Sequence, residues 1–233
     1  MSASPLPTSL LDGLALALIG VGLLMVVLRR LDAAIVAIAA QALLLTAAAL
    51  VVATAEPDHF AHALVAAGLT ALVKVLLIPY VLFLVLARVT ARREADPVLA
   101  TRFAAVIAAA LVLVAYRAAG TLGLTSTADA PTTASLGSGV LPNVLPAALS
   151  LMLLGLFLMV TRRAALMQVL GLITTENGMY LLALVATSGL PLAVELAILV
   201  DVLVGAILLG ILAYRIERTF DHIDTDALRT LRF

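Results

Sequence analysis

The sequence predicts an all-α protein that crosses a membrane seven times, and three observations support this fold class. Of its 233 residues, 64% are hydrophobic and 12% are charged, and the mean hydropathy is +1.21. The apolar residues form successive runs of about 20, the length that crosses a bilayer core as a helix. These runs do not alternate apolar and polar residues as the strands of a membrane β-barrel do. Residues 1–233 are therefore expected to form a single polytopic membrane domain.

The predicted spans follow one another along the chain with short polar or basic connections. The first run has no basic residue ahead of it, so we expect a retained span rather than a signal peptide. A connection over 121–142 is rich in Thr, Ser, Gly and Pro, which is typical of a surface loop. Residues 216–233 form a polar tail. The expected spans are 10–28, 32–54, 61–88, 101–120, 143–161, 165–187 and 190–214.

Basic residues mark every second connection, and they predict the orientation. The N-terminus and the connections near 55–60, 121–142 and 188–190 contain no Lys or Arg. The positive-inside rule then places the N-terminus outside and the C-terminus, with its tail, in the cytoplasm. The membrane is expected to be the plasma or inner membrane of the cell. The basic residues are Arg29 and Arg30, then Arg88, Arg92, Arg93 and Arg102, then Arg162 and Arg163, and finally Arg215, Arg218, Arg229 and Arg232.

The two ends of the chain resemble each other, which predicts an internal repeat. The Arg pair in "VVLRRLD" aligns with the pair in "LMVTRRA", and "LVKVLL" around Lys74 aligns with "LVDVLV" around Asp201. Spans 1–3 and 5–7 would then be parallel three-helix units, over about 10–88 and 143–215, joined by the fourth span.

Four charged residues within the predicted spans stand out. Lys74 lies near the middle of the third span, Glu176 near the middle of the sixth, and Asp201 near the middle of the seventh, with Glu195 nearer the outer end of the seventh. A charge at the bilayer centre costs about 2.5–3.5 kcal/mol on insertion scales, so such residues commonly serve a function. We therefore consider Lys74, Glu176, Glu195 and Asp201 as candidate proton-transfer groups.

Polar neighbours could support proton transfer between these groups. Thr175 and Asn177 flank Glu176, and Gln41 lies in the second span. The structural alternative is that Lys74 pairs with one carboxylate as a tie between helices, while the other acids form hydrogen bonds in their protonated form. Both readings remain open from the residues alone.

Other features of the sequence bear on helix packing. Gly171, Gly178, Gly205 and Gly210 are expected to let helices approach closely. Pro79, soon after Lys74, is expected to kink the third span and free a carbonyl.

The composition excludes several classes of function. Without Cys, and with only His59, His62 and His222 scattered along the chain, no metal site or bound cofactor is expected. The net charge is zero, so there is no basic surface for nucleic acid. No nucleophile–base pair or phosphate loop suggests catalysis by the chain alone.

Three stretches resemble a known family. They are "VKVLLIP" at 73–79, "TENG" at 175–178 followed by "LPLAVELAILVDVL", and "DTDALRTLR" in the tail. The whole chain is similar to the component E membrane subunit of hydrogenase-4, a formate-hydrogenlyase-type complex. Its C-terminal part is similar to the K-type small subunit of respiratory complex I and to the C subunit of multisubunit cation/proton antiporters.

The resemblance implies a non-catalytic subunit of a membrane-bound oxidoreductase complex that couples redox chemistry to ion movement. Its partners would be antiporter-like membrane subunits and cytoplasmic redox subunits. In the related subunits, an acid in each of two successive helices is implicated in proton transfer. Glu176 matches the first acid, and either Glu195 or Asp201 matches the second. The alternatives are a structural scaffold with buried ion pairs and a subunit of a cation/proton antiporter.

Overall fold

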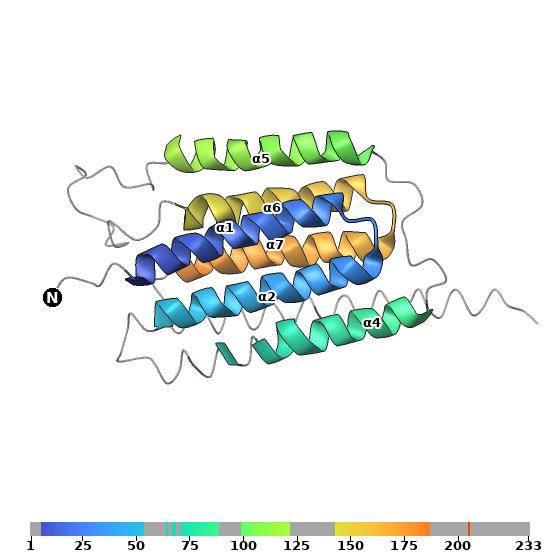
Figure 1. Cartoon of the computed structure of the whole chain (residues 1–233), viewed down its shortest axis with the longest axis horizontal. Coiled ribbons are helices and arrows are strands. Elements are labelled where there is room, and N and C mark those ends of the chain that lie inside the picture. The colour runs from blue at the N-terminus through green and yellow to red at the C-terminus, as the bar shows by residue number, and fades with distance from the viewer. Residues whose placement is uncertain are drawn as a thin grey trace, which may run out of the picture. The chain divides into compact units, whose positions relative to one another are not determined.

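The structure is a computed structural model that describes residues 6–53, 64, 67–68, 71–88, 99–121, 143–186 and 205. The described part is all-helical, as the sequence predicts, in the order α1 to α7 along the chain (Figure 1). Apart from Gly205, the described residues belong to one compact unit, which extends over Met1–Ile198. The helices are α1 (Leu6–Val27), α2 (Leu31–Ala53), the π-helix η2 (Leu72–Leu77) continuing into α4 (Ile78–Arg88), α5 (Thr101–Thr121), α6 (Val144–Thr161) and α7 (Ala165–Ala186).

The helix bounds follow the predicted spans closely wherever the structure describes the chain. Leu- and Ala-rich segments are strong helix formers, and in a bilayer only a helix or closed barrel satisfies every backbone polar group. The first helix ends just before Arg29, and α6 ends just before Arg162. Asn143 precedes α6, and Pro146 lies in its first turn, where a missing N–H is tolerated.

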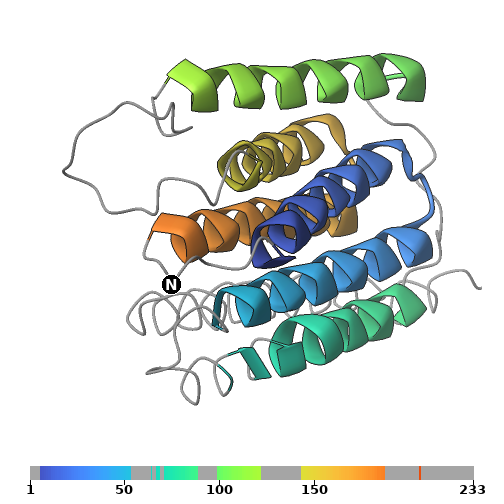
Figure 2. The same cartoon turned by 60° about the vertical axis from the view of Figure 1, so that its left-hand side comes forward.

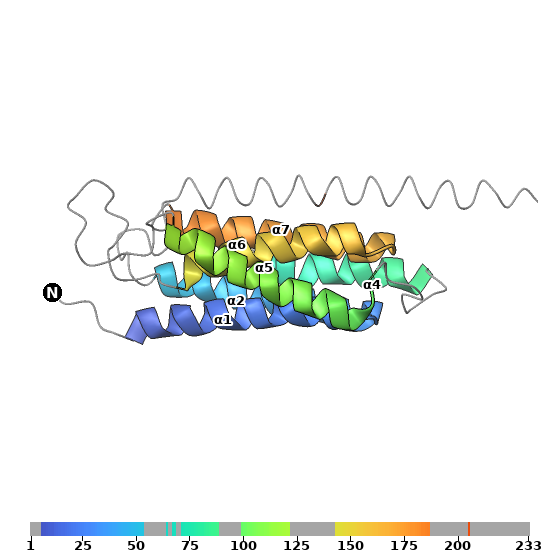
Figure 3. The same cartoon turned by 90° about the horizontal axis from the view of Figure 1, so that it is seen from above.

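Four helices form the centre of the unit. The first two pack against each other, α6 packs against α7, and the two pairs meet through contacts of α1 with α6 and of α2 with α7. The fifth helix packs on α6 and α1, whereas α4 and η2 pack on α2, so these segments flank the centre on opposite sides (Figure 2). Seen from above, the described helices run nearly parallel or antiparallel to one another (Figure 3). This pairing is compatible with the predicted repeat, which stays a prediction.

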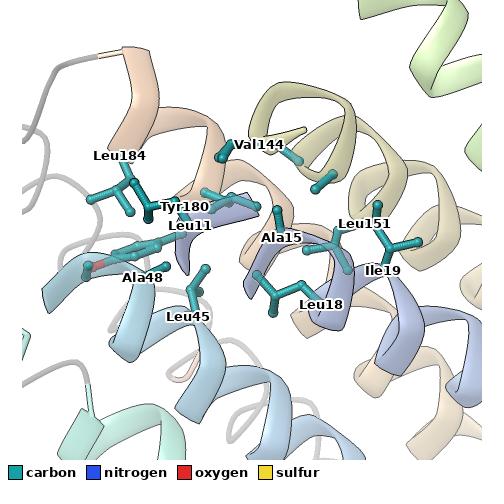
Figure 4. Close-up of a cluster of buried hydrophobic side chains, with 14 residues drawn as sticks. Leu11, Ala15, Leu18, Ile19, Leu45, Ala48, Val144, Leu151, Tyr180 and Leu184 are labelled. Carbon is teal, nitrogen blue, oxygen red and sulfur yellow. The ribbon is translucent and has the colours of Figure 1, made fainter. Parts of the chain in front are cut away.

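An apolar core fills one half of the central four helices (Figure 4). The α1 helix contributes Leu11 and Leu18, and the second half of α7 contributes Tyr180 and Leu184. The remaining members are Ala15, Ile19, Leu45, Ala48, Ala49, Val144, Ala147, Ala148, Leu151 and Leu181.

The outer surfaces of the helices are also apolar. Val106 of α5 is 68% exposed and Val160 of α6 is 79% exposed, while Gln41 and Asn177 are fully buried. A protein in water shows the reverse distribution, and many exposed large apolar side chains together with buried amides indicate contact with lipid or other apolar helices. Four described helices are long and apolar enough to cross a membrane: Ser9–Val27, Leu31–Val52, Thr101–Thr121 and Val144–Thr161. The chain is therefore a helical membrane protein.

The count of seven spans and their orientation stay predictions. Of the expected span over 190–214 the structure describes only Gly205, which is helical. The predicted outer loop is also outside the described residues, apart from its first residue, Thr121. The polar tail lies wholly outside them.

The sixth and seventh helices approach each other so closely that three glycines have no space for a side chain. A Cβ at Gly171 would lie 2.8 Å from the carbonyl oxygen of Gly155, and one at Gly178 would lie 2.7 Å from that of Ala148. The prediction of close packing is thus correct for Gly171 and Gly178, and it missed Gly155. It is not tested for Gly205, because the residues on either side of Gly205 lie outside the described residues. Gly210 lies outside the described residues.

Candidate functional site

A buried polar cluster lies where η2, α2 and α7 meet. It contains Lys74 of η2, Gln41 of α2, and Glu176 and Asn177 of α7. Each of these residues is at most 2% exposed. Gln41 and Glu176 lie near the middle of their helices, so the cluster is far from both ends of the bundle. Three separate segments therefore bring polar groups to one point in an otherwise apolar interior.

The backbone around Lys74 departs from a regular α-helix. Residues Leu72–Leu77 form a π-helix, and the N–H of Ile78 donates to the carbonyl oxygen of Val73, five residues earlier. Pro79 follows at once, and its ring would clash with a carbonyl of the preceding turn in an unmodified α-helix. The wider π turn removes this conflict, and such turns occur frequently at functional sites. At this point the structure has a widened turn that carries Lys74, and the kink expected at Pro79 stays a prediction.

Lys74 and Glu176 form a buried ion pair. The Nζ atom of Lys74 lies 3.1 Å from Oε1 of Glu176. The distance defines an ion pair, but Oε1 does not meet the geometry of a hydrogen bond, and Oε2 has no hydrogen-bond partner among the described residues. We regard the pair as electrostatic, because charge attraction depends on distance more than on angle. The carboxylate therefore keeps lone pairs that no described donor occupies.

A directional series of hydrogen bonds leads from Lys74 to Gln41. Nζ of Lys74 donates to Oδ1 of Asn177 at 3.1 Å, and Nδ2 of Asn177 donates to Oε1 of Gln41 at 3.3 Å. An ammonium group can only donate, so it fixes which end of the Asn177 amide faces it. The orientation of Asn177 in turn fixes the orientation of the Gln41 amide, whose oxygen faces Asn177. Nε2 of Gln41 is buried without a hydrogen-bond partner among the described residues.

Tyr180 completes the surroundings of the ammonium group. The Nζ atom of Lys74 lies 5.1 Å from the centroid of its ring, a distance at which a cation is attracted by the negative face of an aromatic ring. Sequence reasoning missed this residue. The available signal was its spacing, because Tyr180 is four residues after Glu176 and so lies on the same face of the helix.

Of the remaining predicted residues, the structure describes only Thr175, and it separates Thr175 from this cluster. Thr175 donates to the carbonyl oxygen of Gly171 and faces Gly155 of α6, so its hydroxyl belongs to the contact between α6 and α7. Glu195 and Asp201 lie outside the described residues. Among the described residues no group of three or more His, Cys, Asp or Glu side chains could hold a metal ion.

The Arg pairs lie at the end of the central helices that is away from the apolar core of Figure 4. Arg162 is buried, and its guanidinium donates to the carbonyl oxygens of Val26 and Leu28 at the end of α1. Carbonyl groups at a helix end lack helical donors, so a cationic side chain there stabilises the end. In contrast, Arg30 pairs with Asp32 at 2.7 Å on an exposed surface.

These features define the class of protein: a helical membrane protein with a compensated pair of charges, held by amides, in the middle of its helices. No protein-family model matches the chain, and no solved structure matches it. It is 36% identical over 173 residues to a protein of Mycobacterium tuberculosis (strain ATCC 25618 / H37Rv) described as "Uncharacterized protein Rv0085". The match covers 73% of this chain and 74% of the mycobacterial protein. The chain therefore belongs to the same family as that protein.

Proposed function

We propose that this chain is a non-catalytic, multi-pass subunit of a proton-translocating complex in the plasma or inner membrane. The observation that carries the proposal is the ion pair of Lys74 and Glu176, in which the carboxylate has an oxygen without a described partner. Intramembrane acids and bases are typical of proton paths. Glu176 would accept and release the proton, while Lys74 would respond to the change in charge.

The resemblance to hydrogenase-4 component E supports a particular complex. "VKVLLIP" contains Lys74, and "TENG" contains Glu176, so the two motifs that carry the resemblance supply both members of the pair. On this proposal the chain lies beside antiporter-like membrane subunits of a formate-hydrogenlyase-type, complex I-related assembly, with redox subunits on the cytoplasmic side. Glu195 or Asp201 would provide the second acid. A subunit of a cation/proton antiporter is the related alternative.

The test is Glu176→Gln, made in the native complex. We expect fewer protons translocated per electron pair in each assembled complex, measured in inverted membrane vesicles supplied with formate or hydrogen and normalised to the amount of complex on a native gel. The matched control is Asp32→Asn, which also neutralises one acid but on an exposed surface. Its proton yield should equal that of the unaltered complex. An unchanged proton yield in Glu176→Gln would rule out Glu176 as a station of the path.

A structural scaffold is the second candidate. The observation that favours it is that Lys74 and Glu176 neutralise each other's charge. Buried ion pairs also serve to fix which helix faces which. A scaffold role predicts the opposite result from Glu176→Gln: the amount of assembled complex falls, while the protons translocated per electron pair in the remaining complexes stay the same. The two candidates are therefore separated by normalising translocation to the amount of complex.

A further inference from the structure

We propose that the junction of the two Arg pairs binds the phosphate of an anionic phospholipid, with Arg29 and Arg163 contacting the headgroup. The junction consists of the connection from α1 to α2 and the connection from α6 to α7. It lies apart from the polar cluster around Lys74, and its role is independent of proton transfer. The way the junction is held, its depth in the membrane and the surface beside it support a lipid as the ligand.

The two connections meet through Arg162. Its guanidinium donates to the carbonyl oxygen of Val26 and, at 3.0 Å, to that of Leu28. The connections therefore lie side by side, at the right-hand end of the helices in Figure 1. Arg29 directly follows Leu28, and Arg163 directly follows Arg162. Because consecutive Cα atoms are about 3.8 Å apart, both arginines leave the backbone at this one junction.

Hydrogen bonds fix the backbone around both arginines. The residue before Arg29 donates its N–H into the last turn of α1, and the carbonyl oxygen of Arg30 accepts the first backbone hydrogen bond of α2. Before Arg163, the N–H of Arg162 donates into the last turn of α6. The carbonyl oxygen of Arg162 also accepts from Nε2 of Gln168 at 3.0 Å. The junction is therefore ordered before any ligand arrives, which lowers the entropic cost of binding.

Positive charge exceeds negative charge among the described residues of the junction. Four arginines lie there against one carboxylate, that of Asp32. Asp32 pairs with Arg30 at 2.7 Å on an exposed surface, and Arg162 is buried against the end of α1. Arg29 is half-buried, and its Nε has no hydrogen-bond partner among the residues that the structure describes. Guanidinium groups match phosphate oxygens in charge and geometry, so a phosphate here would balance this charge.

The junction lies at the depth of lipid headgroups. The candidate span Ser9–Val27 has 19 residues and Val144–Thr161 has 18. At about 1.5 Å per residue, these helices are about 28 Å and about 27 Å long, close to the roughly 30 Å of a bilayer's hydrocarbon core. Arg29 and Arg163 each follow the end of a span by two residues, which places them where the lipid phosphates lie.

Exposed apolar side chains adjoin the charges. Val27 is 44% exposed and Val160 is 79% exposed, and each precedes an arginine of the junction by two residues. One turn earlier, Leu24 and Leu156 are also exposed. This surface offers contact to acyl chains directly beneath a headgroup. A free phosphate has the same charge chemistry but makes no use of an apolar surface, so the arrangement favours a lipid.

The experiment is native mass spectrometry of the full chain in a non-ionic detergent, titrated with phosphatidylglycerol or with phosphatidylcholine of the same acyl chains. We expect the first phosphatidylglycerol to bind more tightly than the first phosphatidylcholine, and millimolar inorganic phosphate not to displace it. The variant Arg29→Gln/Arg163→Gln should bind phosphatidylglycerol about twenty-five-fold more weakly, about fivefold for each arginine, and lose the preference.

The matched control is Arg117→Gln, which removes an exposed arginine elsewhere on the bundle. The hydroxyl of Tyr116 donates to Oδ1 of Asn143, just before α6, so Arg117 lies near the end of α6 that is far from Arg162. We expect Arg117→Gln to bind phosphatidylglycerol as tightly as the unaltered chain does. Circular dichroism checks that the helices of each variant are intact.

The other outcomes would overturn the proposal. An unchanged preference in Arg29→Gln/Arg163→Gln, or an equal loss in Arg117→Gln, would mean that the total charge of the chain attracts the lipid and the junction does not. Displacement of the lipid by inorganic phosphate would indicate a site for free phosphate. If the double variant loses its helices, Arg29→Gln alone is measured, and an unchanged affinity in that variant excludes the site.

Discussion

Replacing Lys74 with Met tests whether the pair is as buried and as close as the structure shows. At 3.1 Å between Nζ and Oε1, two unit charges attract by about 5 kcal/mol at an effective dielectric constant near 20. The two side chains are 1% and 3% exposed, so solvent does not screen this attraction appreciably. Lys74→Met leaves a carboxylate without its counter-ion, and breaking a buried pair in this way typically costs about 3–5 kcal/mol.

The assay is unfolding in mixed micelles of increasing SDS content, followed by far-ultraviolet circular dichroism. The chain contains no Trp and no Cys, so intrinsic tryptophan fluorescence and thiol-reactive dyes do not report on it. We expect the single variants Lys74→Met and Glu176→Gln to lower the free energy of unfolding, with the larger loss for Lys74→Met. The double variant should recover most of that loss, because neither charge is then left alone.

A loss below about 1 kcal/mol for Lys74→Met, the size usual for an exposed ion pair, would refute the reasoning. It would mean that water or another cation reaches Glu176 once the ammonium is gone. The control is Arg30→Gln, which breaks the exposed pair of Arg30 and Asp32. We expect no measurable change in the unfolding curve of that variant.

Two further predictions concern packing. Gly178→Ala places a Cβ 2.7 Å from the backbone oxygen of Ala148, and overpacking of this kind typically destabilises by about 1–3 kcal/mol. The same SDS titration measures the loss. The control is Gly120→Ala, because a Cβ at Gly120 meets no described atom within 4 Å. Arg162→Gln removes charged donors from the carbonyls of Val26 and Leu28 and should lower stability by about 2 kcal/mol, a loss that an unchanged unfolding curve would contradict.

Much of the helical framework could be predicted because membrane helices are specified by the local composition of each segment. The predicted span over 101–120 corresponds to α5 (Thr101–Thr121), and the span over 165–187 corresponds to α7 (Ala165–Ala186). Within the described residues, apolar length sets the extent of each helix and Arg pairs mark the ends of α1 and α6. These signals are local in the sequence, so they require no knowledge of which helices pack together.

The candidate residues could also be named from the sequence, but not their arrangement. A charged or amide side chain in an apolar helix is conspicuous, so Lys74, Glu176, Asn177 and Gln41 are evident. Which of them meet depends on the rotation of each helix about its axis, which the packing of α2 against α7 decides. Thr175 illustrates the limit, because one residue along the helix from Glu176 it faces α6 instead.

The π turn could not be predicted because its cause is a conflict between two neighbouring features. Pro79 is incompatible with an unmodified helix one turn earlier, but the sequence does not say whether the chain kinks, breaks or widens there. The structure shows widening over Leu72–Leu77. An extra residue in a turn rotates the preceding residues about the helix axis, so the same feature that accommodates Pro79 also determines where Lys74 points.

The polarity of the amide series limits how a proton can travel through the site. Because an ammonium group only donates, Lys74 holds the oxygen of Asn177 toward itself, and Asn177 holds the oxygen of Gln41. Neutral amides have little affinity for an extra proton, so these two side chains orient the ammonium and do not relay a charge. On the proposed function, a proton would therefore reach Glu176 by a route that does not include Asn177 and Gln41; both carboxylate oxygens of Glu176 lack a described hydrogen-bond partner. The amide series thus holds Lys74 in place, and the proposed exchange is left to Glu176 alone.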